Sequence, residues 1–182
     1  FALADGAPDV LALACEVEAS DGGGASFVVD CGRLHAALEA SDDPAARRLA
    51  SFLVETRIDQ TEPGKLPCHG PLGLRGEGGR TWWRGSYCLA PLASDPEPDA
   101  TLARIAEWQA LLRDLAERIE RFHLRPGEVL LADNTRVLHG RDPYVDRGRL
   151  LWRLWAWTDA AVVPDNAYAS SDTSLVAAEP DR

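Results

Sequence analysis

Apolar runs near both ends of the chain predict β-strands there. Near the N-terminal end, residues 9–18 and 25–30 have this pattern, and the glycine-rich segment 20–24 between them predicts a turn and hence a hairpin. Three further strands are predicted near the C-terminal end, at residues 128–133, 135–141 and 149–158. Because these three segments are apolar on both faces, we expect a sheet that is covered on both sides.

Helical periodicity dominates the middle of the chain. Residues 32–40 and 44–53 predict two short helices, and residues 99–123 predict a long amphipathic helix. The apolar stripe of the long helix consists of Leu102, Ile105, Leu112, Leu115, Ile119 and Phe122. The segment 61–79 is rich in glycine and proline and predicts a long loop, which is a candidate lid or wall of a site.

This order of elements, with strands at both ends around a helical insert, indicates a mainly β protein with helices, of the α+β class. An antiparallel double sheet of the jelly-roll type fits this order better than alternating βαβ units. With 182 residues the chain has the size of one domain, so we expect residues 1–182 to form a single domain with its own core.

Composition narrows the classes of partner. A hydrophobic fraction of 46% and a mean hydropathy of −0.20 are typical of a soluble globular protein, and no apolar run reaches membrane-spanning length. The net charge of −10 argues against a nucleic-acid or anionic-membrane surface. The 4 cysteines are widely spaced without a Cys-x-x-Cys pair, so we expect a reduced, cytoplasmic protein.

The segment from Asp133 to Arg141, together with the later run Arg149-Leu-Leu-Trp-Arg153, contains the candidate chemistry. Arginine is rarely buried unless it is paired, so arginines in an apolar strand need anionic partners. Positions four apart on a strand face the same way, so Arg149 and Arg153 can point into one cavity. They lie about 13 Å apart along a strand, so two separate anions are expected. His139, on the preceding strand, is available as a metal ligand or a base.

The run Gly-Glu-Val-Leu-Leu-Ala-Asp-Asn-Thr-Arg-Val-Leu-His-Gly-Arg, followed by Arg-Leu-Leu-Trp-Arg, resembles the C-terminal core of the iron(II)/2-oxoglutarate-dependent dioxygenases. The most similar group is the taurine dioxygenase, γ-butyrobetaine hydroxylase and clavaminate synthase-like superfamily. The resemblance covers roughly residues 7–41 and 126–158. It implies a double-stranded β-helix (jelly-roll) core. It also implies an oxygenase that uses Fe(II), 2-oxoglutarate and dioxygen, most often to hydroxylate a small anionic or zwitterionic molecule.

The resemblance also implies roles for individual residues. The family's metal site is a facial triad of two histidines and one carboxylate, and His139 matches its distal histidine. Arg149 matches the residue that holds the distal carboxylate of 2-oxoglutarate through a bidentate pair, and Ser26 aligns with a hydroxyl residue that binds the same carboxylate. Arg153 matches a position that contacts an anionic group of the substrate. No catalytic residue is expected beyond the metal ligands.

The chain departs from the family pattern at the first metal motif. None of its 4 histidines begins a His-x-Asp or His-x-Glu sequence, and the family motif would fall just before Phe1. We therefore expect the chain to be the C-terminal portion of a catalytic domain, with the two remaining iron ligands upstream. Two other classes stay open: a jelly-roll binding or structural protein without iron catalysis, and a cupin-like metal-dependent isomerase or hydrolase. A His-x-Asp/Glu sequence upstream of Phe1 would favour the oxygenase.

Overall fold

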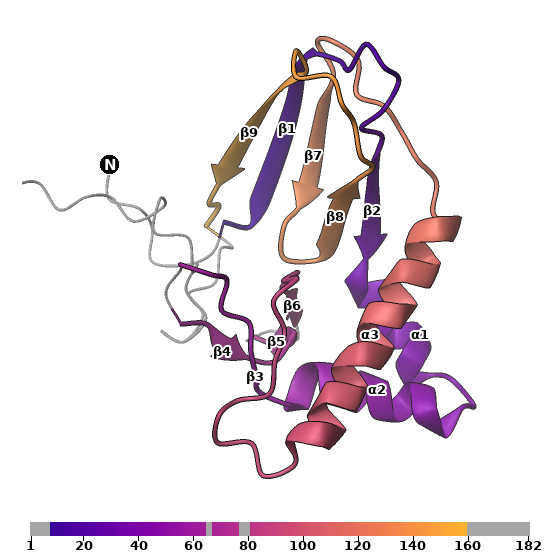
Figure 1. The fold of residues 1–182 in the computed structure, drawn as a ribbon, viewed down its shortest axis with the longest axis vertical. Coiled ribbons are helices and arrows are strands. Elements are labelled where there is room, and N and C mark those ends of the chain that lie inside the picture. The colour runs from indigo at the N-terminus through magenta and orange to yellow at the C-terminus, as the bar shows by residue number, and fades with distance from the viewer. Residues whose placement is uncertain (1–7, 65–66, 77–80, 160–182) are drawn as a thin grey trace, which may run out of the picture.

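The computed structural model describes residues 8–64, 67–76 and 81–159 as three helices and several antiparallel sheets (Figure 1). The helices are α1 (Cys31–Glu39), α2 (Pro44–Glu55) and α3 (Pro98–Arg118). The longer strands are β1 (Val10–Val17), β2 (Ser26–Asp30), β7 (Val129–Asp133), β8 (Val137–Arg141) and β9 (Leu150–Ala156). Four short strands lie between the helices: β3 (Ile58–Asp59), β4 (His69–Gly70), β5 (Gly73–Arg75) and β6 (Thr81–Trp83).

Two antiparallel sheets are built from the strands at the ends of the chain. One has the order β7-β1-β9, and the other consists of β2 and β8. The predicted hairpin between the first two strands is therefore wrong, because β1 and β2 belong to different sheets. The glycine-rich connection leads from one sheet to the other, with Gly22 and Gly24 at φ of 70° and 74°, a region that favours glycine. Asp21 anchors the connection by accepting a hydrogen bond from the amide of Val145 at 2.8 Å.

The predicted helices are present, and local capping defines their starts. The side chain of Asp30 accepts a hydrogen bond from the amide of Arg33 at the start of α1, and Asp43 caps α2 in the same way through Ala45. The long helix ends at Arg118 and not at residue 123 as predicted. Beyond its end, Phe122 exchanges two backbone hydrogen bonds of 2.8 and 3.0 Å with Ser26 of β2, so tertiary strand pairing replaces the last helical turn.

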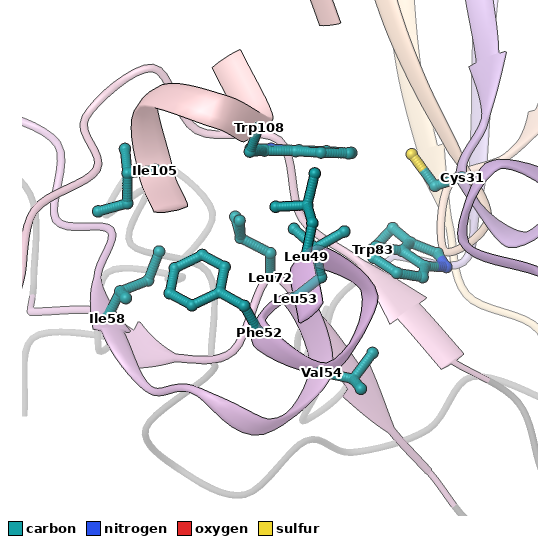
Figure 2. Close-up of a cluster of buried hydrophobic side chains, with 10 residues drawn as sticks. All are labelled: Cys31, Leu49, Phe52, Leu53, Val54, Ile58, Leu72, Trp83, Ile105 and Trp108. Carbon is teal, nitrogen blue, oxygen red and sulfur yellow. The ribbon is translucent and has the colours of Figure 1, made fainter. Parts of the chain in front are cut away.

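The helices and short strands enclose an apolar core (Figure 2). Leu53 of α2 is 1% exposed, Ile58 of β3 is 0% exposed and Trp108 of α3 is 3% exposed. The second sheet joins this core through Val29 of β2 and Leu138 of β8, which pack against it. One face of the β2-β8 sheet is therefore packed against the helical core.

The three-stranded sheet differs, and the prediction that it is covered on both sides is wrong for the described part of the chain. The inner face contains Leu11, which is 0% exposed, whereas Leu131 and Trp152 on the outer face are 69% and 58% exposed. The strand registers place Ala12 and Ala14 of β1 between the large apolar side chains of β7 and β9. Within the described ranges, none of the helices has both the length and the apolar composition that a membrane span requires.

Candidate functional site

An open cavity of about 840 Å³ connects strand β8 with β9, helix α3 and the segment that follows β6. His139, Arg153 and Trp155 line it from the two sheets. Residues of α3 and of the segment after β6 also line it, among them Gln109, Leu112, Arg113, Arg84 and Tyr87. The cavity thus joins the strands from the C-terminal end of the chain to the helical region.

His139 lies in the middle of β8, directly opposite Val28 of β2. The residue is exposed because the cavity is open. Partial burial of the imidazole, together with the positive charge of Arg153, lowers the pKa of His139 from its ordinary value. A lowered pKa favours the neutral imidazole, which is the form that binds a metal ion or accepts a proton.

Arg153 lies on β9 opposite Leu13, on the same face as Trp155. Its guanidinium carbon lies 4.5 Å from the centroid of the Trp155 ring, which is a cation–π distance. Among the residues whose contacts the structure describes, Arg153 has no carboxylate partner. The structure therefore brings together two of the predicted site residues, His139 and Arg153, in one cavity.

Arg149 does not line this cavity. Its Nη2 donates to the carbonyl oxygen of Gly24 at 3.2 Å, and its guanidinium lies 5.0 Å from the ring of Tyr144. Its Nη1 is buried without a hydrogen-bond partner in the described structure. A buried donor without an acceptor costs about 1–3 kcal/mol, so a ligand oxygen at this atom would stabilise it. Arg149 thus has an unused donor and is not part of the lining of this cavity.

Ser26 is also outside the cavity lining. It is 5% exposed at the start of β2, where its backbone pairs with Phe122. Phe27 and Val29, the next residues of β2 on the opposite face, do line the cavity. The side chain of Ser26 lies on the same face of the β2-β8 sheet as that of His139, because Val28, two residues further along β2, is the partner of His139.

A metal ion needs more ligands than the described residues supply. No group of three or more His, Cys, Asp or Glu side chains in residues 8–64, 67–76 and 81–159 is arranged to hold a metal ion. His139, with its neutral imidazole facing a cavity, fits one corner of a facial triad. The described residues therefore fit part of an iron site, and not a complete one.

Several cavity residues were not predicted from the sequence. Trp155 was read only as an apolar strand residue, although its i+2 spacing from Arg153 places both on one face. Arg113 and Gln109 lie on α3, far from the recognised motif, and no sequence signal linked them to it. In the predicted lid segment, Glu62 lines the cavity, whereas His69 pairs with Asp59 at 3.6 Å and does not.

Comparison with known proteins gives three findings. Residues 84–155, which include His139, Arg149 and Arg153, match the family "Taurine catabolism dioxygenase TauD, TfdA family". A search of curated protein sequences gives no match to this chain. Solved structures share the fold.

An asparagine oxygenase is 20% identical with a TM-score of 0.60, over 82% of this chain and 46% of its own. The non-heme iron oxygenase OrfP is 22% identical with a TM-score of 0.55, over 84% of this chain and 46% of its own. AAD-2 is 17% identical with a TM-score of 0.56, over 87% of this chain and 67% of its own.

At these identities the structural likeness is one of fold. The chain spans less than half the length of the asparagine oxygenase and of OrfP. The family match covers residues 84–155, and the solved structures show the fold of the chain.

Proposed function

We propose that this chain forms the C-terminal part of the catalytic domain of an iron(II)/2-oxoglutarate-dependent oxygenase. One observation carries the proposal. His139 and Arg153, at the spacing of the family motif, line the same open cavity inside the segment that matches the TauD family. A neutral imidazole can bind a metal ion, and a guanidinium that has no carboxylate partner among the described residues can bind an anionic ligand beside it.

A jelly-roll core is part of the proposal, and open sheet edges support it. In the described part of the chain, β8 pairs only with β2, and β9 only with β1. Unpaired strand edges accept further strands readily. We propose that strands outside the described residues complete both sheets, and that the strand beside β8 brings the two remaining metal ligands next to His139. Residues 1–182 would then be one portion of a single catalytic domain.

When bound, iron and 2-oxoglutarate supply the oxidising chemistry: dioxygen is consumed, the cofactor is decarboxylated to succinate, and a C–H bond of the substrate is hydroxylated. This chain's own residues bind and orient. His139 would bind the metal through a ring nitrogen of its neutral imidazole. The arginines would hold carboxylates, and Trp155, on the same strand face as Arg153, would exclude water from the cavity.

The two arginines can be assigned in two ways. The resemblance assigns Arg149 and Ser26 to the distal carboxylate of 2-oxoglutarate and Arg153 to the substrate. The unused buried Nη1 of Arg149 supports that assignment. Arg153 lines the same cavity as His139, so the exchanged assignment, with Arg153 on the cofactor, is the alternative. Ser26 shares a sheet face with His139 and Arg149 has the unused donor, so we propose Arg149 as the residue that holds the distal carboxylate of the cofactor.

We propose a small anionic or zwitterionic substrate, such as an amino acid. The cavity contains Arg113 and the carboxylate of Glu62, so both charges of a zwitterion have a candidate partner there. The asparagine oxygenase structure contains 2S,3S-3-hydroxyasparagine, and an OrfP structure contains (3S)-hydroxy-L-Arg. These are ligands of those proteins, and they suggest amino acids as the first compounds to screen.

The test is succinate release from 2-oxoglutarate by the full-length protein that contains this chain. His139→Ala should abolish iron-dependent release while the far-UV circular dichroism stays native. Arg149→Gln and Arg153→Gln test which arginine holds the cofactor. The variant that loses this arginine should need at least a hundredfold more 2-oxoglutarate for half-maximal release, since breaking a buried charged pair costs about 3–5 kcal/mol. Arg118→Gln is the matched control, because Arg118 is 74% exposed and pairs with Asp114 on the surface of α3. Wild-type release by His139→Ala would refute the metal assignment.

One alternative has an observation in its favour. The described residues contain no three-ligand metal group, which is what a jelly-roll binding protein without iron would show. Such a protein would bind a carboxylate ligand without consuming oxygen. Anaerobic titration with iron(II) and 2-oxoglutarate separates the two, because only the oxygenase should develop a visible charge-transfer band.

A further inference from the structure

The backbone around His139 is held by a stack of side chains on the opposite face of β8. His139 and Gly140 are consecutive, so their side-chain positions face opposite sides of the strand. Across the sheet, Val28 is the partner of His139 and Phe27 is the partner of Gly140. The Phe27 ring therefore lies on the face away from the imidazole.

Phe27 occupies the space that a side chain at position 140 would take. A Cβ atom added to Gly140 would lie 2.3 Å from Cζ and 2.6 Å from Cε2 of Phe27. Real Cβ atoms do not approach ring carbons so closely, so the two residues fit only because one of them is glycine. Aromatic rings that cover a cross-strand glycine restore the packing that glycine lacks and fix strand register.

A charged pair supports the other side of the ring. The guanidinium carbon of Arg121 lies 4.4 Å from the centroid of Phe27. Its Nε donates to both carboxylate oxygens of Asp142, at 3.2 and 3.0 Å, and its Nη1 donates to the carbonyl of Ile119 at 2.9 Å. Asp142 in turn donates its amide to the carbonyl of Ala25 at 2.8 Å. The ring is thus held between the Gly140 backbone and a guanidinium fixed at the ends of both strands.

We infer that the Gly140–Phe27–Arg121–Asp142 stack is a positioning device that sets the register of β8 and thereby the direction of the His139 side chain. A slip of one residue between β2 and β8 would move the His139 side chain to the face of the sheet that packs against the helices. Glycine alone would specify this register weakly, because it has no side chain to pack. The Phe27 ring specifies it by fitting only over position 140.

The statement that the stack positions a metal ligand rests on the proposed function. The statement that it sets the register of β8 does not. The test uses the full chain with ¹⁵N-labelled histidines, whose 4 residues give separately assignable ring signals. Phe27→Leu and Gly140→Ala should each shift the ring signals of His139 and leave those of His69 and His123 in place. The double variant should return the His139 signals toward the native positions, because the added methyl group fills the space that the ring leaves. Arg121→Gln should give a smaller shift.

Leu111→Ala is the matched control. Leu111 packs against the helical core and is not part of the stack, so this variant should lower stability without moving the His139 signals. Unchanged His139 signals in Phe27→Leu and Arg121→Gln, or an equal shift in Leu111→Ala, would overturn the inference. Absence of succinate release from the native full-length protein would refute the proposed function and leave this reading untouched.

Discussion

The helical region and the strand region of this molecule differ in how completely they are packed. In the helical region, Leu53 and Ile58 are almost fully buried in a cluster that also contains Leu72 and Trp108 (Figure 2). In the strand region, Leu131 and Leu154 are 69% and 55% exposed, although they are equally apolar. The strand region also contains His139 and Arg153, the candidate site.

This difference in packing indicates that the helical region stabilises the fold, whereas the strand region contains the candidate site. The helical region has the buried area that stabilises a fold, since each fully buried leucine contributes roughly 1.5–3 kcal/mol. The strand region has open edges and an uncovered outer face, and its neighbours in space come from both ends of the chain. Asp30 lies where the two regions meet, at the end of β2 and the start of α1. The following substitutions test this contrast.

The largest effect is expected in the helical core. Leu53→Ala should lower the free energy of unfolding by about 2–5 kcal/mol, because it leaves a cavity in a packed core. Urea unfolding followed by circular dichroism measures the change. A loss below about 1 kcal/mol would mean that this core is loosely packed in solution.

The second largest effect is expected at Asp30, where the helical region and the strand region meet. Asp30 accepts a hydrogen bond from the amide of Arg33 at 3.0 Å, and it also accepts from Nη2 of Arg136 at 2.6 Å. Asp30→Ala should cost about 1–2 kcal/mol, mostly through the lost helix cap. Asp43→Ala is the control, since Asp43 caps α2 through Ala45. If Asp30→Ala lowers the free energy of unfolding more than Asp43→Ala does, the difference measures the contribution of the partly exposed Asp30–Arg136 pair. A difference above about 1 kcal/mol would be too large for a pair at the surface.

Within the strand region, a smaller, pH-dependent effect is expected. Burial, and secondarily Arg153, lowers the pKa of His139 in the folded protein. Below the unfolded pKa of about 6.5, the unfolded chain takes up the proton first. Stability from this group is therefore present above that pH and is lost as the pH falls toward the folded pKa. His139→Gln should reduce the loss between pH 7.5 and 5.5. Identical pH profiles for wild type and His139→Gln would contradict the shift.

The smallest effect is expected on the outer face of the three-stranded sheet. Leu131→Ser should change the free energy of unfolding by no more than about 0.5 kcal/mol, because the side chain is largely exposed. Denaturant unfolding of the full chain measures it. A loss of several kcal/mol would break the comparison, since it would show that this face is covered in solution.

Local patterns predicted the elements but not their partners. The capped helices α1 and α2 and the strands β7, β8 and β9 lie close to their predicted positions, because periodicity, capping and proline act over a few residues. The predicted hairpin was wrong because a turn signal does not state which strand lies across the sheet. The long helix ended at Arg118, because Phe122 found a partner in Ser26 that no local pattern indicates.

The candidate site shows the same division. Strand alternation predicted one face for Arg149 and Arg153, and the roles of His139 as metal ligand and of the arginines as anion partners stay predictions. Alternation says nothing about position along a strand, so it could not separate Arg149, beside Gly24 and Tyr144, from Arg153 in the cavity. The fit of the Phe27 ring over Gly140 was also invisible, because these residues meet only through strand pairing.

The sequence by itself determined which segments become helices and strands, where α1 and α2 begin, and which residues have ligand chemistry. These properties depend on backbone sterics, side-chain period and functional groups, all of which are local. Only the tertiary structure decided the pairing of β1 with β7 and β9, the cavity shared by His139 and Arg153, and the exposure of the outer sheet face. These depend on contacts between residues more than a hundred positions apart, and burial is a property of the assembled neighbours.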